Sequence, residues 1–254
     1  MIHQTYVKPH ILLLELDNPP ANTLAKAMKT QMMEILDTVE KEARLRAVII
    51  TGKGTKFCSG DDLKEAAQNA NHTDKLIHNL RDFSAVINRF EAIDIPIIAA
   101  INGWCIGGGL ELALCCDIRI AVPNSKFISA GVNVGLTASA FRLPRLIGIG
   151  RAKRLLLTGD AIDAKTALEY GIITDIVDPN LLLAKAIEMA KTIVKKAPLA
   201  IKFTKSIANQ AMELEKNYGL NLQQQALERL AQTKDHQTAL KAFLSKTQPI
   251  FEGK

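Results

Sequence analysis

Residues 97–117 read IIAAINGWCIGGGLELALCCD, and the rest of the chain is organised around this stretch. It opens with five apolar residues, a length typical of a buried strand, and the turn dipeptide Asn102-Gly103 follows. Three glycines at 107–109 then lead into good helix formers. Glycine lets another group approach the backbone closely, and the first N–H groups of a helix have no partner inside the helix. The stretch therefore predicts a strand-to-helix joint that offers N–H donors to an anion or a developing oxyanion.

One carboxylate accompanies this joint. Glu111 follows Gly108 by three residues, so both lie on one face of the predicted helix. N–H donors with a carboxylate beside them form a catalytic arrangement. Two structural alternatives stay open, in which the glycines only permit close packing and Glu111 is a buried, hydrogen-bonded acid.

The composition sets broad limits on fold and function. A chain of 254 residues fits one large domain or one domain with an appendage. Apolar residues make up 48% and aromatic residues 5%, so aliphatic side chains must fill most of the core. The net charge of +6 permits a polyphosphate ligand, a nucleic acid or a membrane surface. No basic run dominates, and the spacing of Lys202 and Lys205 is typical of a solvated helix face.

The cysteines and the N-terminus indicate a reducing compartment. Cys58, Cys105, Cys115 and Cys116 have neither metal-ligand spacing nor a spread disulfide pattern, so we expect reduced thiols and no metal. The N-terminus lacks the pattern of a secretory signal, and no apolar run is long enough to span a membrane. We therefore expect a cytoplasmic location and no membrane partner.

The pattern predicts an α/β core followed by helices. Periodicity and turn residues place a strand over 5–16, a helix over 25–43, a strand over 47–51 and a helical segment to about 91. Strands are expected at 117–122 and 172–177, with helices at 151–157 and 163–169 between them. Helices then occupy 181–196, 198–211, 213–232 and 235–246. We divide the chain into a core, 1–195, and a C-terminal helical region, 196–254, that serves as a lid or an oligomer contact.

A second notable stretch, residues 57–64, reads FCSGDDLK. A strand end runs into a glycine turn and then into a polar helix. The simplest interpretation is a turn in which aspartate caps the helix. The alternative is a second backbone donor that faces the first across a crevice.

Six motifs in order resemble one family, the crotonase superfamily or enoyl-CoA hydratase/isomerase family, over essentially the full length. They are residues 57–64, 102–112, 116–121, 135–148, 157–171 and 242–251. The resemblance implies a crotonase-like spiral of β-β-α turns with a C-terminal helical region. It also implies a homotrimer or hexamer that acts on an acyl thioester of coenzyme A in fatty acid metabolism. Coenzyme A is then part of the substrate, and no separate cofactor is expected.

The same resemblance assigns roles to residues. The N–H groups of Asp61 and Gly108 would form the oxyanion hole, and Glu111 would be the general acid–base. Because Asp61 donates through its backbone, its side-chain type is not decisive. Solvated surface charge remains the alternative for Lys64 and Lys246. The residues that would bind the substrate or coenzyme A are Ser59, Asp61, Asp62, Leu63, Lys64, Gly107, Gly108, Phe243 and Lys246.

One position departs from the pattern of the family's hydratases and bears on which reaction the protein catalyses. Hydratases of the family carry a second glutamate, and Gly131 occupies that place here, before a loop that looks shorter than usual. Asp62, Asn133 or Ser139 would be the available polar partners for Glu111, although Asp62 is better explained as a helix cap. We expect weak hydration of crotonyl-CoA, and we expect Gly131→Glu to raise it if the shortened loop can aim the new acid.

The sequence thus predicts an enzyme that stabilises an enolate, with addition of water, a lyase reaction, as its first interpretation. An isomerase, a thioester hydrolase or a decarboxylase with the same oxyanion hole is the close rival. A non-catalytic member is one alternative of another class. An RNA-binding member is a second, but the lack of a basic stripe interleaved with aromatic residues disfavours it.

Overall fold

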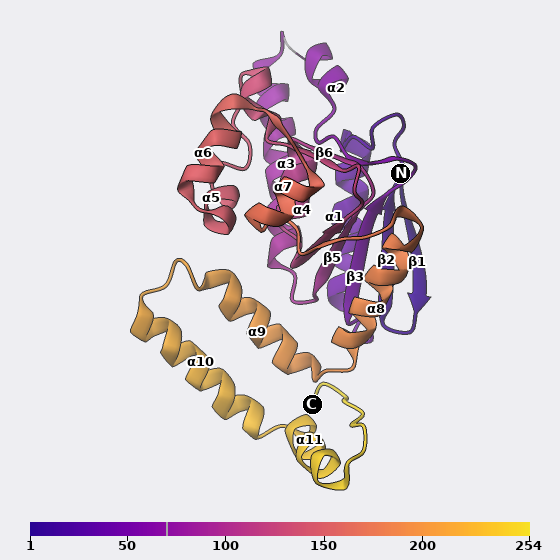
Figure 1. Cartoon of the computed structure of the whole chain (residues 1–254), viewed down its shortest axis with the longest axis vertical. Helices are drawn as coiled ribbons and strands as arrows, with labels where there is room; N and C mark the ends of the chain where they lie inside the picture. The colour runs from indigo at the N-terminus through magenta and orange to yellow at the C-terminus, as the bar shows by residue number, and fades with distance from the viewer. Residues whose placement is uncertain (70) are drawn as a thin grey trace.

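The computed structural model describes residues 1–69 and 71–254, and within these ranges two β-sheets form the framework (Figure 1). The larger sheet has the order β1-β2-β3-β5-β7-β10, and every pairing in it is parallel except that of β1 with β2. Its strands are β1 (Ile2–Lys8), β2 (Ile11–Leu16), β3 (Ala47–Gly52), β5 (Ile97–Ile101), β7 (Ile118–Ala121) and β10 (Asp175–Ile176).

The smaller sheet has the order β4-β6-β8-β9. Its pairings are parallel except that of β8 with β9. Its strands are β4 (Lys56–Cys58), β6 (Trp104–Ile106), β8 (Lys126–Ile128) and β9 (Ala161–Asp163). The parallel direction matters for the site, because it brings the segments that follow β4, β6 and β8 to one edge.

The chain winds between the sheets in successive β-β-α units. After β2, helix α1 (Lys26–Lys41) leads to β3 and β4, and α2 (Leu63–Gln68) with α3 (Thr73–Ala92) completes that unit. The next unit is β5, β6 and α4 (Gly108–Leu114), and β7 and β8 then lead to the 3-10 helix η1 (Ala130–Val134) and α5 (Arg142–Ile147). This is the expected spiral. The remaining elements before the C-terminal region are α6 (Ile149–Thr158), α7 (Ala164–Tyr170) and the 3-10 helix η2 (Pro179–Leu181).

Alternation along the central strands explains why they are apolar throughout. On β3, Val48 and Ile50 face the main core, which lies among the two sheets, α1, α3 and α4, whereas Ile49 faces α8 (Leu182–Val194). Both faces of the strand are thus buried, as periodicity without polar interruptions predicts. Two expectations were too coarse. The segment 5–16 is a hairpin of β1 and β2 with His10 at φ +71°, and the helical segment to 91 is two helices.

The C-terminal helices α9 (Pro198–Gln210), α10 (Lys216–Ala231) and α11 (Lys234–Ser245) confirm the helical pattern and extend away from the sheets (Figure 1). Lys205 of α9 ties this extension to the core, because its Nζ lies 2.8 Å from Asp117 Oδ2 and 3.0 Å from the carbonyl oxygen of Ile95. The expectation that Lys205 lies on a solvated face was therefore wrong. A lysine on a polar stripe can be buried when a carboxylate compensates its charge.

All four cysteines are free and buried, as expected for reduced thiols. Burial raises the pKa of Cys58 to about 12, and Cys116 behaves in the same way, so both stay protonated at neutral pH. In the described part of the chain, no helix combines the length and the apolar character needed to cross a bilayer.

Candidate active site

The predicted site residues gather where three neighbouring parallel strands end. Asp61 follows β4, Gly108 and Glu111 follow β6, and Gly131 follows β8. Since β4 pairs with β6 and β6 pairs with β8, the three segments meet at one edge of the smaller sheet. Carboxyl ends of parallel strands are a usual place for ligand sites. The topology therefore brings together the two glycine motifs and the place of the absent second glutamate.

Each of the three glycines in the central motif has a separate reason. Gly107 has φ +52° and ψ −114°, a conformation that side chains rarely permit. A Cβ on Gly108 would lie 2.7 Å from the Phe83 ring and 3.0 Å from Gly60 Cα. A Cβ on Gly109 would lie 2.1 Å from the Cys58 carbonyl oxygen. Close packing therefore requires glycine at 108 and 109, as the structural alternative from the sequence states, and the donor role of the Gly108 N–H stays a prediction.

The first glycine motif lies directly against the second. Gly60 has φ +85°, and a Cβ there would lie 2.5 Å from Gly108 N. This contact places Asp61, the next residue, beside the first residue of α4. The backbone of this turn is held from the other side, since Leu24 N donates to the Gly60 carbonyl oxygen at 2.8 Å. We call residues 58–61 and 107–109 the donor wall.

The side chain of Asp61 has a defined role. Its Oδ1 accepts from Lys29 Nζ at 2.7 Å, and its Oδ2 accepts from Asn79 Nδ2 at 2.8 Å. Lys29 Nζ also lies 2.5 Å from Asn79 Oδ1, and the Lys29 side chain is 3% exposed. The two carboxylate oxygens thus anchor the turn to α1 and α3. The side-chain type at position 61 therefore matters for how this turn is held, while the donor role of the Asp61 backbone N–H stays a prediction.

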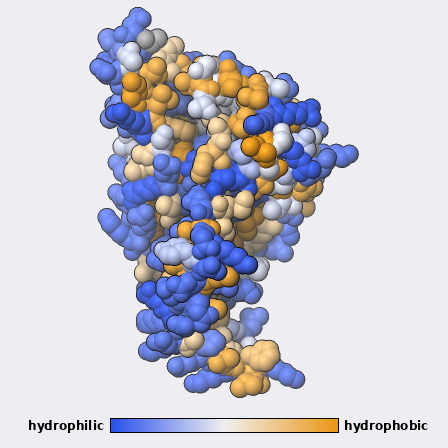
Figure 2. Space-filling model, turned by 90° about the vertical axis from the view of Figure 1, so that its left-hand side faces the viewer, coloured by the Kyte–Doolittle hydropathy of each residue, from blue (hydrophilic) through white to orange (hydrophobic). Residues whose placement is uncertain are grey.

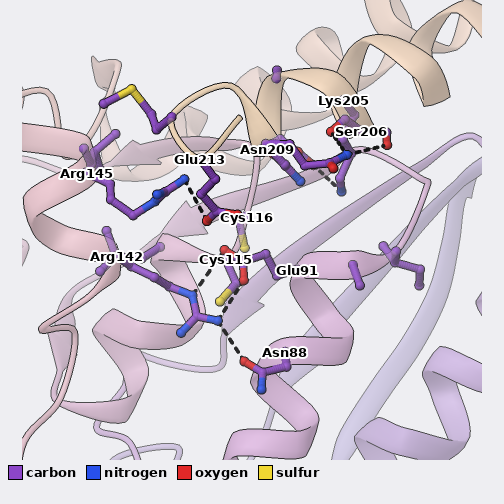
Figure 3. Close-up of a pocket in the computed structure, with 18 of the residues that line it drawn as sticks. Asn88, Glu91, Cys115, Cys116, Arg142, Arg145, Lys205, Ser206, Asn209 and Glu213 are labelled. Carbon is purple, nitrogen blue, oxygen red and sulfur yellow. Dashed lines mark hydrogen bonds and ion pairs between the residues drawn. The ribbon is translucent and has the colours of Figure 1, made fainter. Parts of the chain in front are cut away.

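Glu111 is held by an arginine from the far side of the site. Arg142 of α5 forms an ion pair with Glu111 Oε1. The same guanidinium reaches Glu91 Oε2 at 2.7 Å and Asn88 Oδ1 at 3.0 Å (Figure 3). Burial disfavours the charge on Arg142, but hydrogen bonds to Glu91 and the nearby carboxylates outweigh that penalty and raise the pKa of Arg142. Glu111 therefore faces a cation that stays charged at any working pH.

The other oxygen of Glu111 lacks such a partner. Glu111 is 9% exposed, and among the described residues its Oε2 is one of two buried side-chain oxygens without a hydrogen bond; the other is Ser139 Oγ. Leaving a buried polar atom unpaired costs about 1–3 kcal/mol. Such an atom in a well-packed region is a candidate for contact with a ligand or a water.

The segment after β8 lies next to Gly107 of the donor wall, and we call residues 129–142 the loop wall. Leu136 N donates to the Gly131 carbonyl oxygen at 2.9 Å, and Ser129 Oγ donates to the Ala138 carbonyl oxygen at 3.2 Å. A Cβ on Gly131 would lie 2.6 Å from Ala138 N and 2.9 Å from the Leu136 carbonyl oxygen. The short loop thus occupies the space that a glutamate at 131 would need. The expectation that Gly131→Glu raises hydration is revised accordingly.

The three polar candidates for a partner of Glu111 have different positions. Asp62 caps α2 by accepting from Lys64 N and Glu65 N, and it also accepts from Thr23 Oγ1 at 2.8 Å. Hydrogen bonds to Thr23 and to the backbone outweigh desolvation and lower the pKa of Asp62. Asn133 is exposed and donates to the Gly159 carbonyl oxygen at 3.2 Å. Ser139 alone of the three is buried, and its φ is +59°.

The predicted binding residues fall into two groups. Ser59 lines a cavity of about 400 Å³ with Ala21, Lys56, Trp104 and Ile106, next to the donor wall. Leu63 and Lys64 follow at the exposed start of α2. Phe243 and Lys246 belong to α11 and its end, which lie at the opposite end of the molecule from α2 (Figure 1). One copy of the chain therefore does not bring these two residues to the donor wall.

A larger cavity of about 710 Å³ separates the core from α9. Arg142 and Arg145 of α5 line it together with Lys205 of α9, and Arg145 pairs with Glu213 at 3.2 Å across it (Figure 3). Within residues 1–69 and 71–254, no group of histidine, cysteine, aspartate and glutamate side chains has the arrangement of a metal site.

Several residues that support the candidate site were not predicted from the sequence. Lys29 gives a faint signal, because it falls on the apolar stripe of α1 beside Met28 and Met32. No local sequence signal marks the contacts of Asn79 and Glu91 or the pairing of Arg142 with Glu111. These contacts join residues at least 18 positions apart.

Comparison with known proteins agrees with this geometry. The family model described as "Enoyl-CoA hydratase/isomerase" matches residues 7–254. A crotonyl-CoA hydratase of Syntrophomonas wolfei is 34% identical over 96% of this chain and 95% of its own. A Bacillus subtilis protein, YngF, described as an enoyl-CoA hydratase/isomerase, is 35% identical over 98% of this chain and 97% of its own.

Solved structures give the same result at the level of the fold. The crystal structure of an enoyl-CoA hydratase from Bacillus anthracis superposes with a TM-score of 0.95 and 37% identity, covering 100% of this chain and 99% of that one. The fold and the matched length agree over nearly the whole chain. The chain belongs to the enoyl-CoA hydratase/isomerase family of the crotonase superfamily.

Proposed function

We propose that this protein is an enzyme that acts on an acyl-CoA thioester through an enolate, with Glu111 as its general acid–base. The observation that carries the proposal is the meeting of the donor wall with a buried carboxylate that has one oxygen free of partners among the described residues. The N–H groups of Asp61 and Gly108 would receive the thioester oxygen. The names of the relatives, which include a crotonyl-CoA hydratase, support an enoyl-CoA substrate.

The chemistry follows from where charge develops. Attack at C3, or proton removal at C2, moves negative charge onto the thioester oxygen. Preorganised N–H donors stabilise that charge by about 2.7–4 kcal/mol each in comparable sites. Glu111 has one oxygen fixed by Arg142, so its other oxygen would exchange protons with the substrate while the carboxylate stays oriented.

For hydration, one carboxylate suffices if it acts first as the general base and then as the general acid. Glu111 takes a proton from water while the water oxygen bonds to C3, and the electron pair of the double bond moves toward the thioester oxygen. The enolate then collapses, and C2 takes the proton from Glu111. The net result is H and OH added across C2 and C3, with Glu111 returned to its carboxylate form.

A second part of the proposal concerns assembly. Phe243, Leu244 and Ile250 are each more than 80% exposed, and apolar surface gathers at the C-terminal tip of the molecule (Figure 2). Exposed apolar patches mark interaction surfaces. We propose that this tip packs on another copy in a trimer or hexamer, where Phe243 and Lys246 lie near the coenzyme A of a neighbouring site. Light scattering on the purified protein measures the mass directly.

The test is turnover of a panel of enoyl- and acyl-CoA thioesters by the wild type and by Glu111→Gln. Loss of the general acid–base lowers kcat by about 10²–10⁴-fold. Glu91→Gln is the matched control, because Glu91 also pairs with Arg142 but is not part of α4. Absence of turnover with every thioester, or equal activity of Glu111→Gln, would remove the proposed function. A steep fall of RNA affinity with salt would instead favour the binding-protein alternative.

A further inference from the structure

We infer that Ser139 holds the reacting water in place of the absent second glutamate. The inference rests on the proposed function and names how its site accommodates water. Its starting point is the pair of buried oxygens that lack partners within the described residues, Ser139 Oγ and Glu111 Oε2. A chain of contacts joins the segments that carry these two oxygens.

These contacts link the donor wall, the loop wall and Glu111 in a ring, which we follow from the donor wall. Gly107 N donates to the Ile128 carbonyl oxygen at 2.8 Å, and a Cβ on Gly107 would lie 3.7 Å from Ala130 Cβ. Gly131, the next residue, lies against Ala138 N. Ser139 therefore follows a residue that contacts the strand end beside the donor wall.

The ring closes through Arg142 and Glu111. The Ser139 carbonyl oxygen accepts from Leu143 N at 3.0 Å, which fixes Ser139 one helical turn before Leu143, the second residue of α5. Arg142 then pairs with Glu111, and Glu111 N donates to the Gly107 carbonyl oxygen at 3.0 Å. Each of these segments is thus joined to the next by a specific contact. The two unpaired oxygens belong to two residues of the segments joined in this way.

The conformation of Ser139 supports a functional role. Its φ of +59° places a residue with a side chain in the left-handed region, which costs about 1 kcal/mol or more. Its hydroxyl is buried at a further cost, because no described residue pairs with it. Glycine would remove both costs. Strain and an unpaired hydroxyl at one residue beside a candidate site are typical of a group that contacts a ligand.

One water bridging Ser139 Oγ and Glu111 Oε2 would satisfy both oxygens. A hydroxyl both donates and accepts, so Ser139 can orient the water without changing its own protonation state. Glu111 removes one proton as the water oxygen bonds to C3, and it later delivers that proton to C2. Ser139 then does the orienting work of the second acid, while the proton transfers stay with Glu111.

The test compares a reaction that adds water with one that does not. Ser139→Ala is expected to lower kcat for crotonyl-CoA hydration by about tenfold or more, the size of one hydrogen bond to a reacting water, with KM nearly unchanged. Isomerisation of 3-butenoyl-CoA to crotonyl-CoA, a proton transfer that adds no water, is expected to change by less than about threefold. Ser139→Gly, which suits the left-handed backbone, keeps the test valid if the alanine variant folds poorly.

A matched control separates this role from packing. Ser125 is fully buried, and its Oγ donates to the Ile101 carbonyl oxygen at 3.1 Å. Ser125→Ala should lower the melting temperature and leave hydration intact, whereas Ser139→Ala should leave the melting temperature unchanged or higher, since it removes an unpaired hydroxyl.

The outcomes are distinguishable. Unchanged hydration in both Ser139 variants, or an equal loss of hydration and isomerisation, would overturn the inference. A wild type that isomerises but does not hydrate would also overturn it and leave the proposed function standing. A Glu111→Gln variant as active as the wild type in both reactions would instead remove the proposed function.

Discussion

The donor wall and the loop wall lie against each other where Gly107 N donates to the Ile128 carbonyl oxygen, but they are built in different ways. The donor wall is made of backbone, and its geometry depends on glycines at 60 and 107–109 that allow two turns to touch. The loop wall is made of side chains that reach across the fold, with Arg142 binding Glu111 and with Ser139 left unpaired. The geometry of a wall made of backbone depends on local sequence, here on the glycines. The geometry of a wall made of side chains depends on which distant segments of the chain meet.

The largest expected effect comes from the donor wall. Gly108→Val is expected to lower kcat by about 10²–10³-fold, the cost of losing one oxyanion donor. Its side chain would push against the Phe83 ring and against Gly60 Cα, which a Cβ would approach to 3.0 Å. Steady-state kinetics and circular dichroism separate lost donor geometry from lost folding. A folded variant with normal turnover would place the oxyanion hole elsewhere.

The next effect tests the loop wall. Arg142→Met leaves Glu111 and Glu91 without their shared cation, and breaking a buried ion pair costs about 3–5 kcal/mol of unfolding free energy. We expect a lower denaturation midpoint in urea together with lower kcat. Arg145→Met is the control on the same helix, because its pairing with Glu213 is half-exposed. Equal midpoints for the two variants would show that Arg142 does not support Glu111.

A smaller effect is expected from the anchor of Asp61. Lys29→Met should lower kcat about tenfold with little change in KM, because the turn that carries the Asp61 N–H loses its ion pair with α1. Lys26→Met on the exposed face of α1 is the control. The double variant Lys29→Met/Asp61→Ala should recover stability, since no buried charge is then left unpaired. Failure to recover it would mean that the ion pair with Asp61 is not what makes the loss of Lys29 costly.

The smallest expected change in activity concerns Gly131. Gly131→Glu should not raise crotonyl-CoA hydration, because the backbone of residues 136–138 occupies the space for its side chain. Forcing atoms into packed space costs about 1–3 kcal/mol, so the melting temperature should fall. A variant with faster hydration than the wild type would show that the short loop moves to make room for the glutamate. That result would weaken the role assigned to Ser139.

These contrasts explain what the sequence could predict. The strand of residues 97–101, the glycine joint and Glu111 follow from periodicity and local turn chemistry, and the structure places them together as expected. Helices 198–210 and 216–231 follow from the same periodicity. Their direction away from the core does not, because it depends on anchors such as Lys205, whose partner Asp117 is 88 residues away.

The loop wall was beyond prediction for the same physical reason. The sequence shows that a glutamate is absent at 131 but not that the loop fills its space. It explains Asp62 as a helix cap but does not choose between Asn133 and Ser139, which only burial and hydrogen bonding separate. The anchor of Asp61 was missed because a lysine on an apolar stripe has no local pattern that names its carboxylate.

The central claim is that the two walls act on one thioester, and infrared difference spectra of bound crotonyl-CoA test it most directly. In the wild type, the N–H donors polarise the thioester carbonyl, so its C=O stretch should shift to lower frequency relative to free crotonyl-CoA. Glu111→Gln should keep that shift and lose turnover, whereas Gly108→Val should lose both. A wild-type C=O stretch at the frequency of free crotonyl-CoA, with normal turnover, would contradict the account.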